Sequence, residues 1–91
     1  SILRPCVSRQ MPDLETRYES PYGEIGVHWQ LKEETVELHI CVPENTTSVL
    51  QIERAKCMID TDGVLFTKKA EGNYTAELSS GCYQFRYIFK D

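Results

Sequence analysis

The chain is 91 residues long, with 41% hydrophobic residues, 26% charged residues and a formal net charge of −4. These values predict one small globular domain over residues 1–91, and the scattered positions of the ten basic residues argue against nucleic acid as a partner. No apolar run approaches the roughly 20 residues that cross a membrane, so we expect no membrane partner. Because the chain does not begin with Met, we expect it to be a fragment of a larger protein.

The first half of the chain contains three runs in which apolar and polar residues alternate. They are residues 14–18, 25–31 and 36–42. A period of two predicts strands that bury one face. The first two runs are separated by Ser20-Pro21-Tyr22-Gly23, whose residue types are typical of a type I turn.

The second and third runs predict a hairpin whose register can be worked out. If residues 32–35 form the loop, Leu31 pairs with Val36, and Trp29 then faces Leu38. In this register the large apolar side chains all lie on one side, whereas a shift by one residue would move them into water. We therefore expect Trp29 to be nearly buried.

The second half of the chain continues with short strands. Pro43 has no N–H to give to a sheet, so it ends the third run. Alternation resumes at residues 48–52, 74–78 and 83–89. A weak helical pattern covers residues 49–58, but its start also fits a strand.

Turn residues separate these strands. Asp62-Gly63 and Ser79-Ser80-Gly81 predict hairpin turns, and the polar residues 68–72 predict a loop. The fold class that follows is all-β: an antiparallel β-sandwich of Greek-key or immunoglobulin-like type, with about six to eight short strands.

The four cysteines are Cys6, Cys41, Cys57 and Cys82. No two of them have the spacing of a metal knuckle or a redox pair. Strand alternation gives no obvious facing pair, so we predict four free thiols. Free thiols favour a cytoplasmic location over a secreted or periplasmic one.

Two histidines form the sharpest chemical constellation. In the hairpin register, His28 and His39 are directly opposed on the outward face, and Cys41 lies two residues along. Opposed side chains have Cβ atoms about 4.5–5.5 Å apart, close enough for two imidazoles to share a zinc or nickel ion. A structural zinc site needs four ligands, and Cys41 is the only obvious third, so we predict surface histidines and no metal or cofactor.

We expect no catalytic residue. A glycosidase needs two carboxyl groups placed across a cleft, and the acids here fall at turns or on outward faces. They are Glu33, Glu34, Glu37, Glu44, Asp60 and Asp62. Trp29 lies on the core side and is predicted to be a core residue instead of a sugar-stacking platform. Tyr22 is the better candidate for a ligand or domain contact, although packing over its own turn is the favoured interpretation.

Three segments, in this order, resemble the C-terminal domain of bacterial α-L-rhamnosidases of glycoside hydrolase family seventy-eight. The first runs from Tyr18 to Ile25 and on to Trp29, the second from Val42 to Thr47, and the third from Glu77 to Phe85. The positions that carry the resemblance are Ser20, Pro21, Tyr22, Gly23, Trp29, Pro43, Asn45, Thr46, Thr47, Gly81, Tyr83 and Phe85. Cys41, Cys57 and Cys82 depart from the pattern, since polar or small aliphatic residues are expected there.

The resemblance implies a non-catalytic C-terminal domain that packs on and stabilises a preceding helical (α/α) barrel of the same parent chain. The parent would be an inverting α-L-rhamnosidase acting on a rhamnose-containing glycan or glycoside, with its catalytic acids in the barrel. Two alternatives stay open. A carbohydrate-binding module of another glycan-degrading enzyme would show exposed coplanar aromatic rings, and an unrelated immunoglobulin-like interaction domain would be favoured by a disulfide joining the two sheets.

Overall fold

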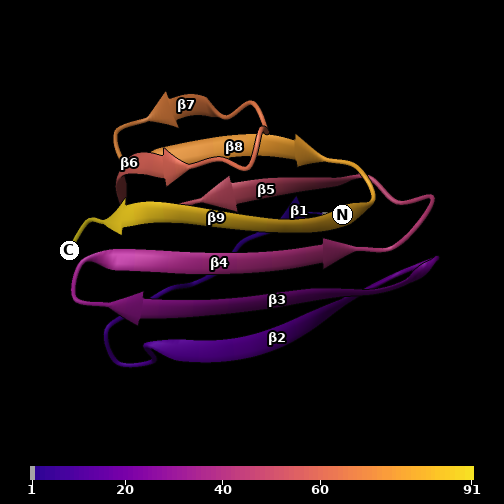
Figure 1. Cartoon of the computed structure of the whole chain (residues 1–91), viewed down its shortest axis with the longest axis horizontal. Helices are drawn as coiled ribbons and strands as arrows, with labels where there is room; N and C mark the ends of the chain where they lie inside the picture. Colours follow the sequence, from indigo (N-terminus) through magenta and orange to yellow (C-terminus); the bar gives the residue numbers. More distant parts are fainter. Residues whose placement is uncertain (1) are drawn as a thin grey trace.

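The computed structural model describes residues 2–91 and consists of two β-sheets packed face to face (Figure 1). Within that range the strands are β1 (Ile2–Leu3), β2 (Asp13–Ser20), β3 (Gly23–Lys32), β4 (Thr35–Val42), β5 (Ser48–Ile52), β6 (Ala55–Asp60), β7 (Thr67–Ala70), β8 (Asn73–Leu78) and β9 (Gly81–Phe89). No helix long and apolar enough to cross a membrane occurs in residues 2–91.

The larger sheet has the strand order β2-β3-β4-β9-β6, and the smaller sheet has the order β1-β5-β8-β7. Every pairing is antiparallel except that of β1 with β5, which is parallel. The predicted β-sandwich is confirmed. The nine strands among the described residues exceed the predicted six to eight, because two short edge strands, β1 and β7, had no clear alternation to reveal them.

The predicted register of the first hairpin is confirmed. Leu31 pairs with Val36, Trp29 with Leu38, and His28 with His39. Its inward side chains are buried, and Trp29 keeps only 2% of its surface exposed. Hydrophobic burial on one face therefore selected this register, as the alternation predicts.

Two turns that were predicted to close hairpins instead carry the chain between the sheets. Asp62-Gly63 lies between β6 of the larger sheet and β7 of the smaller one, and Ser79-Ser80 with Gly81 joins β8 to β9, which are also in different sheets. Asp62, Gly63 and Gly81 have positive φ angles of 50°, 74° and 138°, which suit a sharp reversal. Such residues specify that the chain turns, but they do not specify which strand it pairs with afterwards.

The weak helical pattern over residues 49–58 does not form a helix. The alternative, that its start is a strand, is confirmed, since β5 runs to Ile52 and the chain then reverses at Arg54 with φ of 60° and enters β6. Within the predicted loop 68–72, residues up to Ala70 belong to β7, which pairs with β8 and contains an irregularity between Lys68 and Ala70. The strand was not predicted because Lys68 and Lys69 give it the polar composition of a loop. Charged residues are, however, common on an edge strand exposed to solvent.

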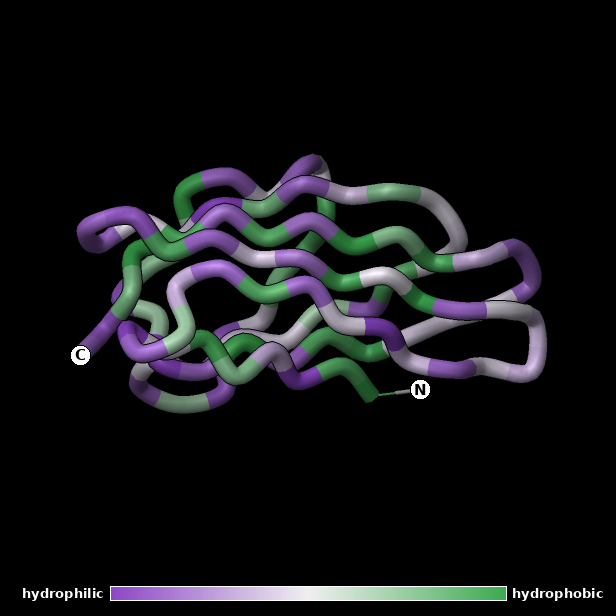
Figure 2. Tube along the Cα trace, turned by 90° about the horizontal axis from the view of Figure 1, so that it is seen from below, coloured by the Kyte–Doolittle hydropathy of each residue, from purple (hydrophilic) through white to green (hydrophobic). Residues whose placement is uncertain are grey.

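The core lies between the sheets. Figure 2 shows hydrophobic and hydrophilic residues alternating along the strands, so that each sheet presents one apolar face to the other. The largest fully buried side chains are Tyr87, Phe85, Phe89, Leu3, Ile25, Leu38, Ile40, Leu50, Ile52, Leu78, Val27 and Val36. Burial raises the pKa of the Tyr87 hydroxyl far above its ordinary value, because the charged form would lose its water.

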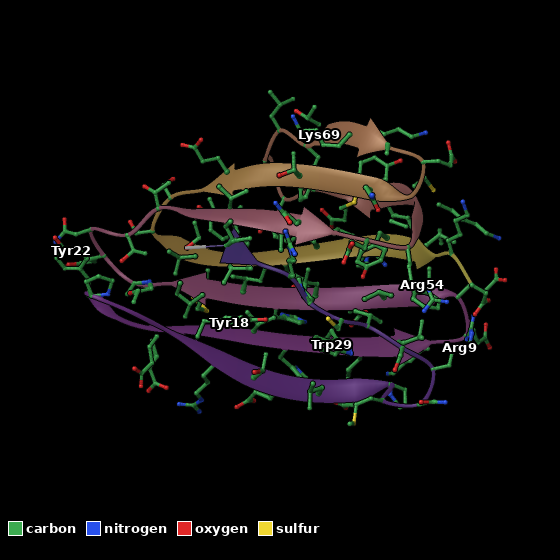
Figure 3. The ribbon with its side chains drawn as sticks, turned by 180° about the vertical axis from the view of Figure 1, so that it is seen from behind. Arg9, Tyr18, Tyr22, Trp29, Arg54 and Lys69 are labelled. Carbon is green, nitrogen blue, oxygen red and sulfur yellow. A yellow bond between two sulfur atoms is a disulfide. The ribbon has the colours of Figure 1, made fainter. Side chains whose placement is uncertain are left out.

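The segment before β2 is tied to the C-terminal residue. The Arg9 guanidinium donates to both carboxylate oxygens of Asp91, at 2.5 and 2.9 Å, and to the carbonyl oxygen of Glu33 at 2.6 Å. Arg9 and Arg54 both lie over the ring of Phe89, with 5.4 and 4.9 Å between guanidinium carbon and ring centroid. Figure 3 shows both arginines at the same end of the sandwich, opposite the end that carries Tyr22.

Candidate functional site

The predicted histidine pair lies on the outward face of the larger sheet, on β3 and β4. The His28 and His39 rings are stacked, with centroids 6.2 Å apart and an interplanar angle of 28°. A third residue that the sequence reasoning missed joins them: Nε2 of His28 lies 2.8 Å from Oδ1 of Asp13 on β2. Asp13 pairs directly with Gln30, so it reaches His28 diagonally across the strands.

Cys41 does not join the histidines as a metal ligand, because it forms a disulfide with Cys82. Strand β9 pairs with β4 so that these two residues are opposed, with Cα atoms 4.0 Å apart. The prediction of four free thiols is therefore wrong, although Cys6 and Cys57 are free and exposed. In residues 2–91 no group of three or more His, Cys, Asp or Glu side chains is arranged to hold a metal ion.

Hydrogen bonds from two neighbouring side chains, Gln30 and His28, favour the charged form of the Asp13 carboxylate. The Gln30 amide, 2.9 Å from Oδ2, and then His28 lower the pKa of Asp13 below its ordinary value of 3.8. A lowered folded-state pKa adds stability that is present above the ordinary value and is lost as the pH falls through the lowered one.

We expect Gln30→Ala to raise the pKa of Asp13, because it removes the stronger of the two hydrogen-bonding causes. The side-chain carboxyl carbon, followed by NMR as a function of pH, gives this value directly. Gln84→Ala is the matched control, since Gln84 lies on the same face but pairs with His39. An Asp13 pKa that stays low in Gln30→Ala would contradict the assignment.

The family-motif residues of the first block shape the tip of the β2–β3 hairpin. The Ser20 hydroxyl donates to the Gly23 carbonyl oxygen at 2.6 Å. Gly23 has a φ of 131°, which favours glycine, and a Cβ placed there would lie 3.5 Å from Cβ of Pro43, so the tip lies beside the second block. Pro21 and Tyr22 form the tip itself, and Tyr22 is 63% exposed instead of packed over its turn (Figure 3).

The second and third blocks form two of the connections at which the chain passes from one sheet to the other, β4 to β5 and β8 to β9. After Pro43, Asn45 has a φ of 60°, and the Thr46 hydroxyl donates to the Glu44 carbonyl oxygen at 3.3 Å. Thr47 is exposed just before β5. These residues shape the backbone, and none of them directs a reactive group into a cleft.

The third block stabilises its connection through an aromatic side chain. The Tyr83 hydroxyl donates to the Ser79 carbonyl oxygen at 2.8 Å, four residues upstream. The Tyr83 ring stacks on Phe85 at 5.8 Å, and Phe85 meets Phe66 edge to face at 5.1 Å. A tyrosine bonded back to the chain in this way braces the crossover between sheets in immunoglobulin-like sandwiches.

Two of the candidate carboxylates have structural roles. Oδ1 of Asp60 accepts from the N–H of Asp62 at 3.0 Å, and Oδ2 of Asp62 accepts from the N–H of Gln84 at 3.0 Å. Strand β6 ends at Asp60, so Asp62 satisfies a backbone donor of β9 that β6 no longer reaches. Glu33 and Glu34 lie in the β3–β4 loop, where Glu33 has a φ of 58°.

The structure lacks the features expected of an immunoglobulin-like interaction domain or an aromatic carbohydrate-binding module in the residues that it describes. Cys41–Cys82 joins two strands of one sheet, so it is not the disulfide between sheets that would favour an immunoglobulin-like interaction domain. Trp29 is buried, and in residues 2–91 Tyr22 is the single aromatic residue that is largely exposed. The described part of the chain therefore presents no set of coplanar exposed rings of the kind that a carbohydrate-binding module uses.

Comparison with known proteins gives a consistent set of similarities. Residues 1–61 match the family model described as the bacterial alpha-L-rhamnosidase C-terminal domain. An alpha-L-rhamnosidase of Formosa agariphila is 32% identical over 50 residues, which are 55% of this chain and 5% of that protein. The structure of an alpha-L-rhamnosidase from Dictyoglumus thermophilum matches with a TM-score of 0.73 and 22% identity, over 96% of this chain and 11% of that one, a likeness of fold. The chain thus spans a small part of both relatives.

Proposed function

Since this chain belongs to the family of bacterial α-L-rhamnosidase C-terminal domains, we propose that it is the accessory domain of a larger glycoside hydrolase and carries out no hydrolysis itself. Its partner is the catalytic (α/α) barrel of the same parent chain, on which it packs and which it stabilises. The parent acts on a rhamnose-containing glycan or glycoside. The observation that carries this proposal is the family match over residues 1–61 in a chain that spans only 5% of a full-length relative.

The placement of the carboxylates supports the absence of catalysis. Hydrolysis of a glycoside needs a proton donor and a base or nucleophile on opposite sides of one sugar ring. Here Asp60 and Asp62 bind backbone N–H groups, and Glu33 and Glu34 lie at an exposed hairpin loop. All four acids are exposed to solvent, so none lies in the apolar surroundings that an acid catalyst needs.

Tyr22 is the proposed point of contact with the barrel. It is a large aromatic side chain, 63% exposed, at the tip of a hairpin whose backbone is fixed by Ser20 and by the close approach of Gly23 to Pro43. A rigid, exposed aromatic residue is the type of side chain that anchors protein interfaces. We therefore expect Tyr22→Ala to leave the isolated domain stable while lowering the melting temperature of the full-length parent.

The isolated chain is expected to hydrolyse an aryl α-L-rhamnoside at the rate of buffer alone. Deleting the domain from the full-length parent is expected to lower the melting temperature of the remaining enzyme, because apolar surface on the barrel becomes exposed to water. Release of the aryl alcohol and differential scanning calorimetry measure the two effects.

One result would refute the accessory role: turnover by the chain that is lost when Glu33, Glu34, Asp60 or Asp62 is replaced by the corresponding amide. Turnover that survives all four replacements would instead identify a contaminating enzyme. A parent that keeps its melting temperature after the deletion would contradict the stabilising role.

A further inference from the structure

The outward face of the smaller sheet contains two hollows. On β5 and β8 the inward residues alternate with outward ones, and Gln51 pairs with Thr75 on the outward side. Thr67 of β7 continues this row, since it pairs with Thr75 from the other side. Figure 3 views this face, with β5 and β8 crossing it and Lys69 on β7 above them.

A first hollow of about 220 Å³ lies at one end of this face. Its lining includes two side-chain amides, a carboxylate, an ammonium group and a hydroxyl, contributed by Gln51, Asn73, Glu53, Lys69 and Thr75. In the part of the chain that the structure describes, the side chains of Glu53, Lys69 and Asn73 form no hydrogen bond or ion pair with another residue. These polar groups are therefore free to bind hydroxyl groups of a ligand.

An irregularity of the strand pairing opens this hollow. The register between β7 and β8 shifts between Lys68 and Ala70, so that Lys69 has no partner residue opposite it. An extra residue of this kind bends its strand and redirects a side chain, and such irregularities are frequent next to binding sites. Lys69 thereby joins Glu53 and Asn73 at the same hollow.

A second hollow of about 390 Å³ adjoins the first, since Thr75 lines both. Its lining contains the apolar residues Val49, Leu65 and Ala76 beside Thr67, Thr75 and Glu77, and Leu65 is 86% exposed. The two hollows together, which we call the outer hollows, offer an apolar part next to a part rich in hydrogen-bonding groups.

We propose that the outer hollows bind a neutral saccharide of one or two sugar rings. A pyranose ring has apolar C–H surfaces and a rim of hydroxyl groups that both donate and accept. Leu65 and Val49 can pack against the C–H surface. The amides of Gln51 and Asn73, with the Glu53 carboxylate, can form hydrogen bonds with the hydroxyl groups. Glu53 and Glu77 outnumber Lys69 among the charged residues of the lining, which disfavours an anionic ligand.

This binding site goes beyond the accessory role and does not depend on it. Tyr74 is the aromatic residue in the lining, and it is half-buried, so hydrogen bonds must supply most of the affinity. We expect a dissociation constant on the order of 1 mM or weaker.

The test is a titration of the isotopically labelled chain with L-rhamnose, followed by two-dimensional amide NMR. We expect saturable shifts confined to residues 49–53, 65–69 and 73–77. Asn73→Ala removes a hydrogen-bonding group, and Glu53→Gln replaces a charged acceptor by a weaker neutral one. Both are expected to raise the dissociation constant about three- to ten-fold. Gln84→Ala, on the outward face of the larger sheet, is the matched control and should bind as the unchanged chain does.

Two further probes define the ligand class. Glycerol, a polyol without a ring, is expected to give no saturable shifts, and galacturonate is expected to bind no more tightly than a neutral sugar. The proposal fails if L-rhamnose and a neutral disaccharide both leave the spectrum unchanged, if the shifts lie on β3, β4 and β9, or if Asn73→Ala and Glu53→Gln bind normally. Tighter binding of galacturonate would overturn the assignment to neutral saccharides.

Discussion

Trp29→Ala is expected to destabilise the domain by about 3–5 kcal/mol. Trp29 is 2% exposed at the centre of the larger sheet, where it pairs with Leu38 on one side and Leu14 on the other. Its indole N–H also donates to the Met11 carbonyl oxygen at 3.3 Å, which ties the segment before β2 to the sheet. Truncation would leave a cavity and release that segment, and the loss is large relative to the roughly 5–15 kcal/mol that stabilises a whole domain.

Thermal and urea unfolding followed by circular dichroism measure this loss. Tyr22→Ala is the matched control, because it removes an aromatic ring that is exposed, and we expect it to change the stability by no more than about 0.5 kcal/mol. A Trp29→Ala chain that melts at the temperature of the unchanged protein would contradict the core placement.

Replacing both members of the disulfide, Cys41→Ser with Cys82→Ser, is expected to cost about 2–4 kcal/mol. The bond closes a loop over a sequence separation of 41 residues, so it removes many conformations from the unfolded chain. The double replacement leaves no unpaired partner thiol. Chemical unfolding without reductant measures the loss, and the unchanged chain in dithiothreitol should unfold at the same denaturant concentration as the double variant.

Cys6→Ser with Cys57→Ser is the control, since both thiols are exposed and unpaired. Thiol titration of the denatured, non-reduced chain is expected to count two thiols. A count of four would contradict the disulfide. Four free thiols would also support the cytoplasmic location, which was predicted from them and stays a prediction.

Local pairings could be predicted from the sequence, whereas distant ones could not. The β3–β4 register follows from one short loop and from the apolar alternation of Val27, Trp29 and Leu31, because a single slip would expose them all. Nothing comparable fixes which strand lies beside β4 on its other edge. The pairing of Cys41 with Cys82 depends on that choice, and so the disulfide was missed.

The candidate site shows the same division. The opposition of His28 and His39 lies within one hairpin and was predicted correctly. Asp13 lies on β2, just before the first alternating run, and no sequence pattern fixed its position relative to β3, so its contact with His28 was not foreseen. The outer hollows were missed because the polar residues of β7 predict a loop, which hides the row that Thr67 forms with Thr75 and Gln51.

Strand β9 is the last strand of the chain, yet it lies between β4 and β6 inside the larger sheet (Figure 1). During synthesis, β2, β3 and β4 can pair as they emerge, but β4 keeps an open hydrogen-bonding edge until β9 has also been made. Such an edge invites pairing with other chains, so the nascent domain is most prone to aggregation just before it is complete. A domain that lacks β9 would stay in that state, and degradation by proteases would be its expected fate.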